Sequence, residues 1–158
     1  MARVLITGMS GAGKSTLLDG LARRGYLAID TDYDGWMLGI GLWDEPRITA
    51  LLKTTPTVIV SGTVHNQTKF YSLFDHIVLL SAPLDTLLSR VSARASNPYG
   101  KRPEEAAKIA QYLRTVEPLL RRGATIELDG RDDRESLVDA AAALLGSGPD
   151  EVPSTRMV

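Results

Sequence analysis

Short runs of aliphatic residues recur along the chain and alternate with longer segments of mixed polarity. Each run is apolar at nearly every position, which is typical of strands that helices cover on both faces of a parallel sheet. Turn-forming residues bound the runs. We therefore predict five strands, at residues 4–7, 26–30, 57–61, 76–81 and 125–129.

The segments between these runs carry apolar residues at helical spacing. The first such stripe, 17–22, is followed by Gly25, which is typical of a left-handed helix cap. Others lie at 84–91, 109–120 and 137–145; a proline at 118 is expected to break the third, and Asp132 with Glu135 has capping-box-like spacing before the last. Strands that alternate with helices predict an α/β fold, a five-stranded parallel sheet sandwiched by helices.

The domain organisation follows from length and pattern. A chain of 158 residues is expected to form one domain, here residues 1–145, because chains usually divide only beyond roughly 250 residues. Two long stretches without a strand pattern, about 31–56 and 95–103, are the kind that carry a binding segment or a lid. Residues 146–158 have no periodicity and are predicted to form a flexible C-terminal tail.

Composition narrows the function classes. The chain has no cysteine, which excludes a disulfide scaffold, a thiolate zinc site and a cysteine nucleophile. The net charge of -1 argues against a dedicated nucleic-acid or membrane-surface binder, so neither partner is expected. No apolar run approaches the roughly 18 residues of a membrane span, and the apolar N-terminal stretch is too short for a signal peptide. We expect a soluble, cytoplasmic protein.

The strongest motif follows the first predicted strand. The segment GMSGAGKS, from Gly8 to Ser15, matches GxxxxGK[ST] and precedes the first predicted helix. Glycines let the backbone curl with its amides inward, Lys14 supplies a cation to the β- and γ-phosphates, and the Ser15 hydroxyl is a Mg²⁺ ligand. The predicted nucleotide-binding residues are Gly8, Ser10, Gly11, Ala12, Gly13, Lys14, Ser15 and Thr16.

This motif in its strand–helix context resembles the P-loop kinases of small molecules and nucleotides, the group of nucleoside monophosphate kinases, shikimate kinases and gluconate kinases. The resemblance covers most of residues 1–145. It implies a five-stranded parallel sheet with a short lid at about 95–103, an acceptor region at about 31–56, and ATP with Mg²⁺ as cofactors. It also implies transfer of the γ-phosphate to a bound acceptor.

Three acids, Asp30, Asp32 and Asp34, alternate where the second strand ends, at the sheet edge that carries parallel-sheet sites. If the chain stays extended, all three point the same way. The stretch looks like the Asp-x-Asp of shikimate kinase-like enzymes, which implies that Asp30 lies on the Mg²⁺ side and Asp32 orients the acceptor or acts as base. Asp34 is a further acceptor candidate. The alternative is that these acids cap a helix or turn.

Strand three ends in SGT, without the acid of a Walker B segment, which raises the importance of Asp30. Ser61 and Thr63 either bind a magnesium water or the acceptor, or simply terminate the strand. His65, Asn66 and Gln67 follow and are candidates to face the same cleft.

Arg90 and Arg94 are four residues apart, so they share one face of the helix that precedes the lid segment NPYGKR. The layout resembles the arginine pair that flanks the lid of adenylate kinases and implies a catalytic grip on the transferring phosphates. Lys101 and Arg102 would lie on the lid. The alternative is an ordinary basic helix surface. In the resembling kinases the loop after the last strand frames the adenine, and Arg131 is at that place.

The acceptor region contains two tryptophans and Arg47. Trp36 and Trp43 either stack on a flat substrate or pack the core of this segment, and Arg47 is a candidate clamp for a carboxylate or phosphate. The leading hypothesis is an ATP- and Mg²⁺-dependent phosphotransferase with a small hydroxylated or phosphorylated acceptor. The alternative is a nucleotide-binding regulatory ATPase or switch module. The sequence does not distinguish a preference for ATP from one for GTP, or a monomer from a homodimer.

Overall fold

A five-stranded parallel sheet forms the centre of the molecule. The computed structural model describes residues 2–39, 41–93 and 102–146. The strands β1 (Arg3–Thr7), β2 (Ala28–Asp30), β3 (Val58–Ser61), β4 (His76–Ser81) and β5 (Ile126–Asp129) lie in the order β2-β3-β1-β4-β5, all parallel. The predicted fold class is thereby confirmed, with three of the five strands starting one or two residues later than the pattern indicated.

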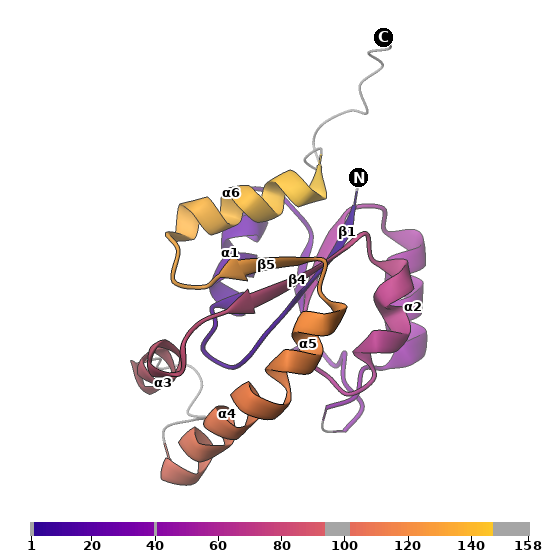
Figure 1. Cartoon of the computed structure of the whole chain (residues 1–158). Helices are drawn as coiled ribbons and strands as arrows, with labels where there is room; N and C mark the ends of the chain where they lie inside the picture. The colour runs from indigo at the N-terminus through magenta and orange to yellow at the C-terminus, as the bar shows by residue number, and fades with distance from the viewer. Residues whose placement is uncertain (1, 40, 94–101, 147–158) are drawn as a thin grey trace.

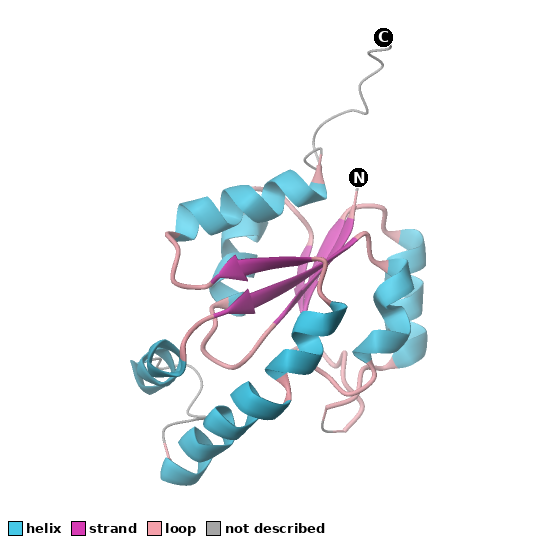
Figure 2. Ribbon diagram, viewed as in Figure 1, coloured by secondary structure: helices cyan, strands magenta, loops and turns pink. Residues whose placement is uncertain are grey.

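Helices cover both faces of the sheet (Figures 1 and 2). On one face lie α1 (Lys14–Arg23) and α6 (Arg134–Leu145), which contact each other. On the other lie α2 (Glu45–Thr54) and the 3₁₀ helix η1 (Gln67–Leu73). The remaining helices are α3 (Leu84–Ala93), α4 (Pro103–Thr115) and α5 (Glu117–Gly123). In the described part of the chain, none of these helices has the length and apolar character that crossing a bilayer requires.

This two-sided cover explains why the strand segments are apolar throughout. In β1, Val4 and Ile6 pack into the core cluster beneath α1 and α6, whereas Leu5 between them packs into the cluster beneath α2. All three side chains are buried. A strand that alternates between two cores needs an apolar residue at every position, so the hydrophobic pattern loses its period of two.

The helix boundaries correct one expectation and add a helix that was not predicted. The cap of α6 is Asp133, whose side chain accepts a hydrogen bond from the Ser136 amide at 3.3 Å, and not Asp132 as the spacing suggested. The stretch 31–56, predicted only to lack a strand pattern, contains the helix α2, capped by Asp44. The expected break at Pro118 is confirmed, because α4 ends at Thr115 and α5 begins anew.

Trp43 packs in the core, as one of the two interpretations of the tryptophans had it. Its side chain is 1% exposed and meets the Phe70 ring edge-on at 5.7 Å. The indole N–H donates to Thr31 Oγ1 at 2.9 Å, and the Asn66 side chain bonds both backbone polar groups of Trp43. The tryptophan therefore joins the start of the 31–56 segment to the loop after β3.

The contact between α1 and α6 leads to a stability prediction at Gly20. A Cβ at this position would lie 2.6 Å from Cγ2 of Val138, whose β-branched side chain has little freedom to turn in a helix. We expect Gly20→Ala to lower the free energy of unfolding by about 1–2 kcal/mol, because overpacking of about 1–3 kcal/mol outweighs the gain of up to about 1 kcal/mol in helix propensity.

Chemical denaturation of Gly20→Ala, Val138→Ala and the double variant checks this prediction. The double variant is expected to be more stable than the sum of the two single effects allows, because the alanine methyl at 20 then fills the space left at 138. Additive effects would show that the two side chains do not compete for the same volume.

Candidate functional site

The phosphate-binding loop connects β1 to α1 and has a backbone that only glycine fits. Gly11 and Gly13 have positive φ values of 88° and 108°. A Cβ on Gly8 would collide with the Leu80 carbonyl oxygen of β4, and one on Gly11 would lie 2.6 Å from the Leu87 carbonyl oxygen of α3. The loop is thus curled and pressed against neighbouring backbone, as the motif predicted.

The N-terminus of α1 faces this loop without a side-chain cap. Gly13 is the N-cap residue, and no side chain bonds the first amides of the helix. Those N–H groups keep their capacity to donate, and the helix dipole adds positive potential at the same place. Together with the loop amides, the helix end is built for a polyphosphate.

Two cations bond the carbonyl oxygens of the loop. Lys14 donates from Nζ to the carbonyls of Gly8 and Met9. Arg90 reaches over from α3 and donates to the carbonyl oxygen of Ala12 at 3.0 Å and to that of Gly130 at 2.6 Å. Arg90 therefore braces the loop against the segment after β5. Its predicted partner Arg94, together with Lys101 and most of the expected lid, lies outside the described residues.

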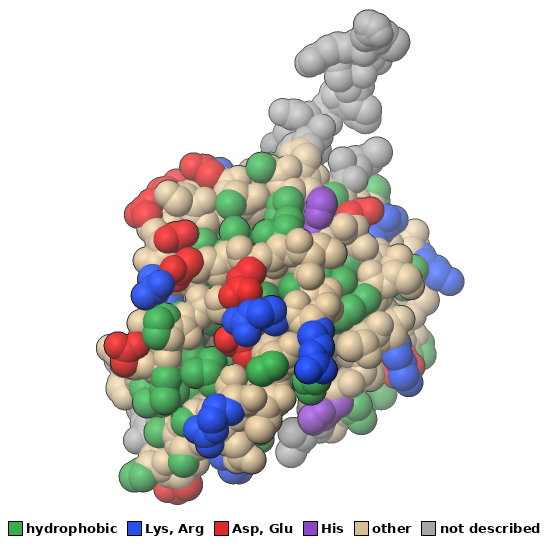
Figure 3. Space-filling view, in the orientation of Figure 1, with side chains coloured by type: hydrophobic (Ala, Val, Ile, Leu, Met, Phe, Trp, Pro, Cys, Tyr) green, Lys and Arg blue, Asp and Glu red, His purple; other side chains and the backbone are tan. Residues whose placement is uncertain are grey.

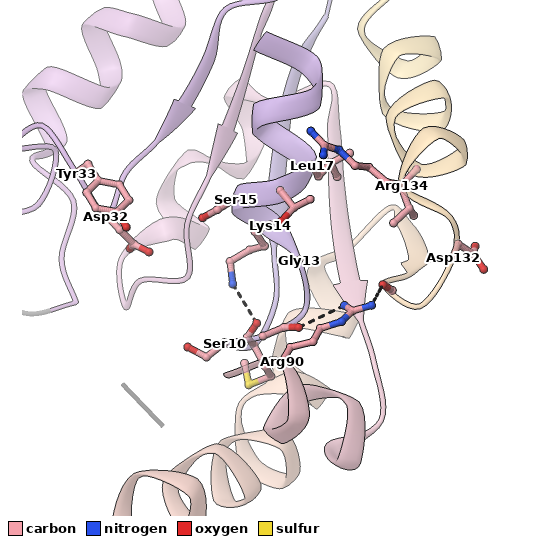
Figure 4. Close-up of a pocket in the computed structure, with 15 residues that line it drawn as sticks. Ser10, Gly13, Lys14, Ser15, Leu17, Asp32, Tyr33, Arg90, Asp132 and Arg134 are labelled. Atoms are coloured by element: carbon pink, nitrogen blue, oxygen red, sulfur yellow. Dashed lines mark hydrogen bonds between the residues drawn. The ribbon is translucent and has the colours of Figure 1, made fainter. Parts of the chain in front are cut away.

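A cavity of about 530 Å³ surrounds the start of α1. Figure 4 shows Lys14 and Ser15 in its middle, with Asp32 and Tyr33 on one side and Asp132 and Arg134 on the other. The cavity is large enough for a nucleotide-sized ligand. It is lined by Met9, Ser10, Gly11, Gly13, Lys14, Ser15, Thr16, Leu17, Asp32, Tyr33, Arg90, Gly130, Asp132, Arg134 and Leu137.

Ser15 and Asp30 form a pair that suits Mg²⁺. The Ser15 hydroxyl donates to Asp30 Oδ2 at 2.8 Å, and Asp30 Oδ1 accepts from the Asp32 amide at 3.1 Å. Hydroxyl and carboxylate oxygens are the hard ligands that this ion prefers. Within the described residues no cluster of three or more acidic, histidine or cysteine side chains forms a metal cage. Such a site fits an ion that takes its other ligands from phosphates and water.

The three aspartates do not line up as an extended chain would place them. The backbone turns directly after β2: the Tyr33 amide bonds the Asp30 carbonyl oxygen at 3.2 Å, and Asp34 has a positive φ of 62°. Asp32 lines the cavity, whereas Asp34 does not. The expectation that all three point the same way depended on an extended chain, and the turn after β2 removes that condition.

A partly buried chain of hydrogen bonds lies where strand three ends without an acid. The Thr63 hydroxyl donates to the Gly8 carbonyl oxygen at 2.8 Å and accepts from the Gly8 amide at 3.2 Å. It also lies 3.0 Å from Thr7 Oγ1, which accepts from Gln67 Nε2 at 3.2 Å. Gln67, 2% exposed, donates to the Tyr71 hydroxyl as well. The chain anchors the first residue of the phosphate loop to η1.

Arg47 lies away from the cavity. Its guanidinium carbon is 3.9 Å from the centroid of the Trp36 ring, and Nη1 donates to the Asp34 carbonyl oxygen at 2.7 Å. These contacts fix the turn after β2 from the side of α2. The acceptor roles predicted for Arg47 and Asp34 stay predictions.

Arg131 pairs with the last residue of β5. Its guanidinium bonds Asp129 at 2.8 Å, and this hydrogen bond lowers the pKa of Asp129 to about 2. The neighbouring Gly130 and Asp132 line the cavity, but Arg131 does not, and its nucleotide role stays a prediction.

Several lining residues were not singled out by the sequence. Tyr33 precedes a predicted acid, and Arg134 and Leu137 belong to the first turns of α6. Their place could have been inferred, because the segment after the last strand leaves the same sheet edge as the phosphate loop. Nothing in the spacing, however, indicates which side chains of α6 turn toward α1.

Comparison with known proteins identifies the family to which the protein belongs. A family model described as an AAA domain matches residues 4–111, more than half of the chain, so the protein belongs to this family of P-loop domains. No curated protein matches the sequence significantly.

Solved structures share the fold over nearly the whole chain. The shikimate kinase of Bacteroides thetaiotaomicron superposes with a TM-score of 0.69 at 23% identity, over 91% of this chain and 98% of that one. The shikimate kinase of Acinetobacter baumannii gives a TM-score of 0.66 at 19% identity, over 92% and 91%. A gluconokinase from Sinorhizobium meliloti 1021 gives 0.63 at 22% identity, over 91% of both chains. The expected resemblance to P-loop small-molecule kinases is confirmed as a likeness of fold.

The chain of hydrogen bonds between Gln67 and Gly8 leads to a prediction for Thr63. Thr63→Val removes the hydroxyl that bonds the Gly8 amide and carbonyl; the carbonyl keeps its bond from Lys14, whereas the amide loses this acceptor, at a cost of about 1–3 kcal/mol. We expect the Kd for Mg-ATP to rise about tenfold, corresponding to about 1.4 kcal/mol, while Thr63→Ser keeps near-normal affinity. Titration calorimetry on the three proteins checks this. Equal affinities in all three proteins would show that Thr63 does not support the phosphate loop.

Proposed function

We propose that this protein is a Mg²⁺-dependent phosphotransferase that moves the γ-phosphate of ATP to a hydroxyl group of a small acceptor. One observation carries the proposal: the cavity around α1 meets a second, smaller cavity of about 220 Å³, and both are lined by Lys14 and Asp32. A donor site and an acceptor site that share a cation and a carboxylate have the layout that in-line transfer requires.

The larger cavity is the donor site in this proposal. The loop amides and the N-terminus of α1 hold the β- and γ-phosphates, and Lys14 exchanges its bonds to the Gly8 and Met9 carbonyls for phosphate oxygens. Ammonium groups on flexible stems make such an exchange at little cost. Arg90 keeps the loop closed from outside through the Ala12 and Gly130 carbonyls.

Ser15 and Asp30 hold the magnesium ion, Ser15 as a ligand and Asp30 beside it. When bound, the ion neutralises charge on the β- and γ-phosphate oxygens. The hydrogen bond of 2.8 Å from Ser15 to Asp30 Oδ2 would hold the serine hydroxyl in place for the ion.

Asp32 orients the acceptor. Its carboxylate accepts the hydrogen bond of the acceptor hydroxyl, whose oxygen then forms a bond to the γ-phosphorus while the bond to the bridging oxygen of ADP breaks. The hydroxyl proton passes to the carboxylate. In a loose transition state most of this contribution is positioning, because the proton becomes acidic only late in the transfer.

The second cavity favours this function over the regulatory ATPase. A switch module needs a nucleotide site and a moving segment, but it needs no solvent-accessible space that opens on the γ-phosphate side of the lysine. The smaller cavity provides that space next to Lys14 and Asp32.

Lys14→Ala tests the donor site. We expect turnover to fall by about 10²-fold or more, because the charge stabilisation of the transferring phosphate is removed. Lys53→Ala, an exposed position in α2 outside both cavities, is the matched control and should keep full activity. ADP release coupled to acceptor phosphorylation is the measurement. Full activity of the Lys14 variant would contradict the donor assignment.

Asp32→Asn tests the acceptor role. The amide keeps the shape but not the negative charge, so we expect kcat to fall by about 10²-fold or more while the KM for ATP stays within about two-fold. Asp139→Asn, an exposed carboxylate on α6 paired with Arg24, serves as control for a general charge effect. Unchanged kcat in the Asp32 variant would remove its assigned role.

A further inference from the structure

The carbonyl oxygens of Gly8 and Met9, which accept hydrogen bonds from Lys14, each have a second donor. The Gly8 carbonyl oxygen also accepts from the Thr63 hydroxyl at 2.8 Å. The Met9 carbonyl oxygen also accepts from the Ala12 amide at 3.1 Å. A carbonyl oxygen has two lone pairs and can take both donors at once. Neither carbonyl is therefore left unpaired when Lys14 turns to a phosphate.

The two second donors differ in how they are fixed. The Ala12 amide is part of the backbone and has one direction, whereas the Thr63 hydroxyl can rotate and has a single proton to give. That proton goes to the Gly8 carbonyl, which can only accept, and the same hydroxyl oxygen accepts from the Gly8 amide at 3.2 Å. The Gly8 carbonyl therefore keeps its second donor only while the neighbours of Thr63 hold this proton in place.

Thr7 is the neighbour that fixes the Thr63 proton. The two hydroxyl oxygens lie 3.0 Å apart. Because Thr63 gives its own proton to Gly8, Thr7 must be the donor in this pair. Thr7 is fully buried, so bulk water does not compete for its hydroxyl. A proton that points from Thr7 to Thr63 prevents the Thr63 proton from turning the other way, and it stays on the Gly8 carbonyl.

Gln67, which is 2% exposed, fixes Thr7 in turn. The orientation of its amide is set by Val64, whose backbone N–H donates to Gln67 Oε1 at 2.8 Å. Gln67 Nε2 therefore faces Thr7 Oγ1 at 3.2 Å and the Tyr71 hydroxyl at 2.8 Å. Since this nitrogen can only donate, Thr7 accepts from it and keeps its own proton for Thr63. The direction of donation thus runs from Gln67 toward the phosphate loop.

From this order of donors we infer that Gln67 is a positioning residue: it keeps the Gly8 carbonyl paired from the side of the sheet, which frees Lys14 for a phosphate. Gln67 lies outside the lining of both cavities and acts through Thr7 and Thr63. Without its amide the two hydroxyl protons can turn, and the Gly8 carbonyl then depends on Lys14, whose release would leave it unpaired. The inference rests on the donor site of the proposed function and is independent of the acceptor.

A double-mutant cycle between Gln67 and Lys14 tests the inference by titration calorimetry with Mg-ATP on the full chain. Gln67→Met keeps the shape of the side chain and removes its amide. We expect it to raise the Kd about fivefold, because Lys14 must then leave a carbonyl that has no other donor. In the Lys14→Ala background the same change is expected to alter the Kd by less than about twofold, since no lysine has to be released. Gln111→Met, at an exposed position of α4 outside both cavities, is the matched control and should leave the Kd unchanged.

Variants of Thr7 break the chain at its middle and leave the Gln67 side chain in place. In the same two backgrounds Thr7→Val is expected to repeat the behaviour of Gln67→Met, whereas Thr7→Ser keeps the hydroxyl and a near-normal Kd. An equal loss of affinity with and without Lys14 would mean that the loop is merely distorted, which overturns the inference and leaves the proposed function standing. Unchanged affinity in both Gln67→Met and Thr7→Val overturns it too. If the unchanged protein does not bind Mg-ATP at all, the proposed function itself is contradicted.

Discussion

The site depends on one backbone constraint: the loop between β1 and α1 turns its amides inward, and its carbonyls must then find donors elsewhere. Positive φ at Gly11 and Gly13 permits the curl. Lys14 and Arg90 supply the donors, bonding carbonyls of Gly8, Met9, Ala12 and Gly130. The two cations are not equivalent, because the fork of an arginine bridges two fixed carbonyls, whereas an ammonium can exchange partners. Arg90 is thus suited to hold the loop, and Lys14 to leave it for a phosphate.

The ends of β2 and β3 contact the phosphate loop in different ways. Strand β3 ends without a carboxylate, and its Thr63 bonds Gly8 instead. The carboxylate that meets Ser15 comes from β2, as Asp30. Because the sheet order is β2-β3-β1, β3 lies between the strand that carries the loop and the strand that carries the acid. On the face shown in Figure 3 acidic and basic side chains lie interspersed among apolar ones.

The sequence predicted what short-range patterns encode. The five strands, the loop and the break at Pro118 follow from hydrophobic runs, a spaced motif and a missing amide, all within about ten residues. It did not predict the turn after β2, because alternating acids are compatible with an extended chain and with a turn. Groups outside this segment stabilise the turn, such as Arg47, which donates to the Asp34 carbonyl oxygen. Helix α2 was not predicted either, although Asp44 and the proline in the first turn are ordinary signals of a helix start.

The side of the smaller cavity that Ile109 and Tyr112 of α4 form illustrates why such tertiary features escape a pattern. The spacing of Ile109 in an apolar stripe correctly indicates a helix face, but not that the next turn of that face borders the phosphate loop. That placement is relayed by packing: a Cβ on Gly11 would lie 3.1 Å from Val91 Cγ2 of α3, and α3 in turn contacts α4. Val91 and Ile109 belong to one core cluster. The glycine that lets the loop curl is therefore also the residue that lets α3 come close enough to bring α4, and with it Tyr112, to the edge of the site. The geometry of the loop and the position of α4 beside the smaller cavity are in this way two consequences of the same close backbone approach.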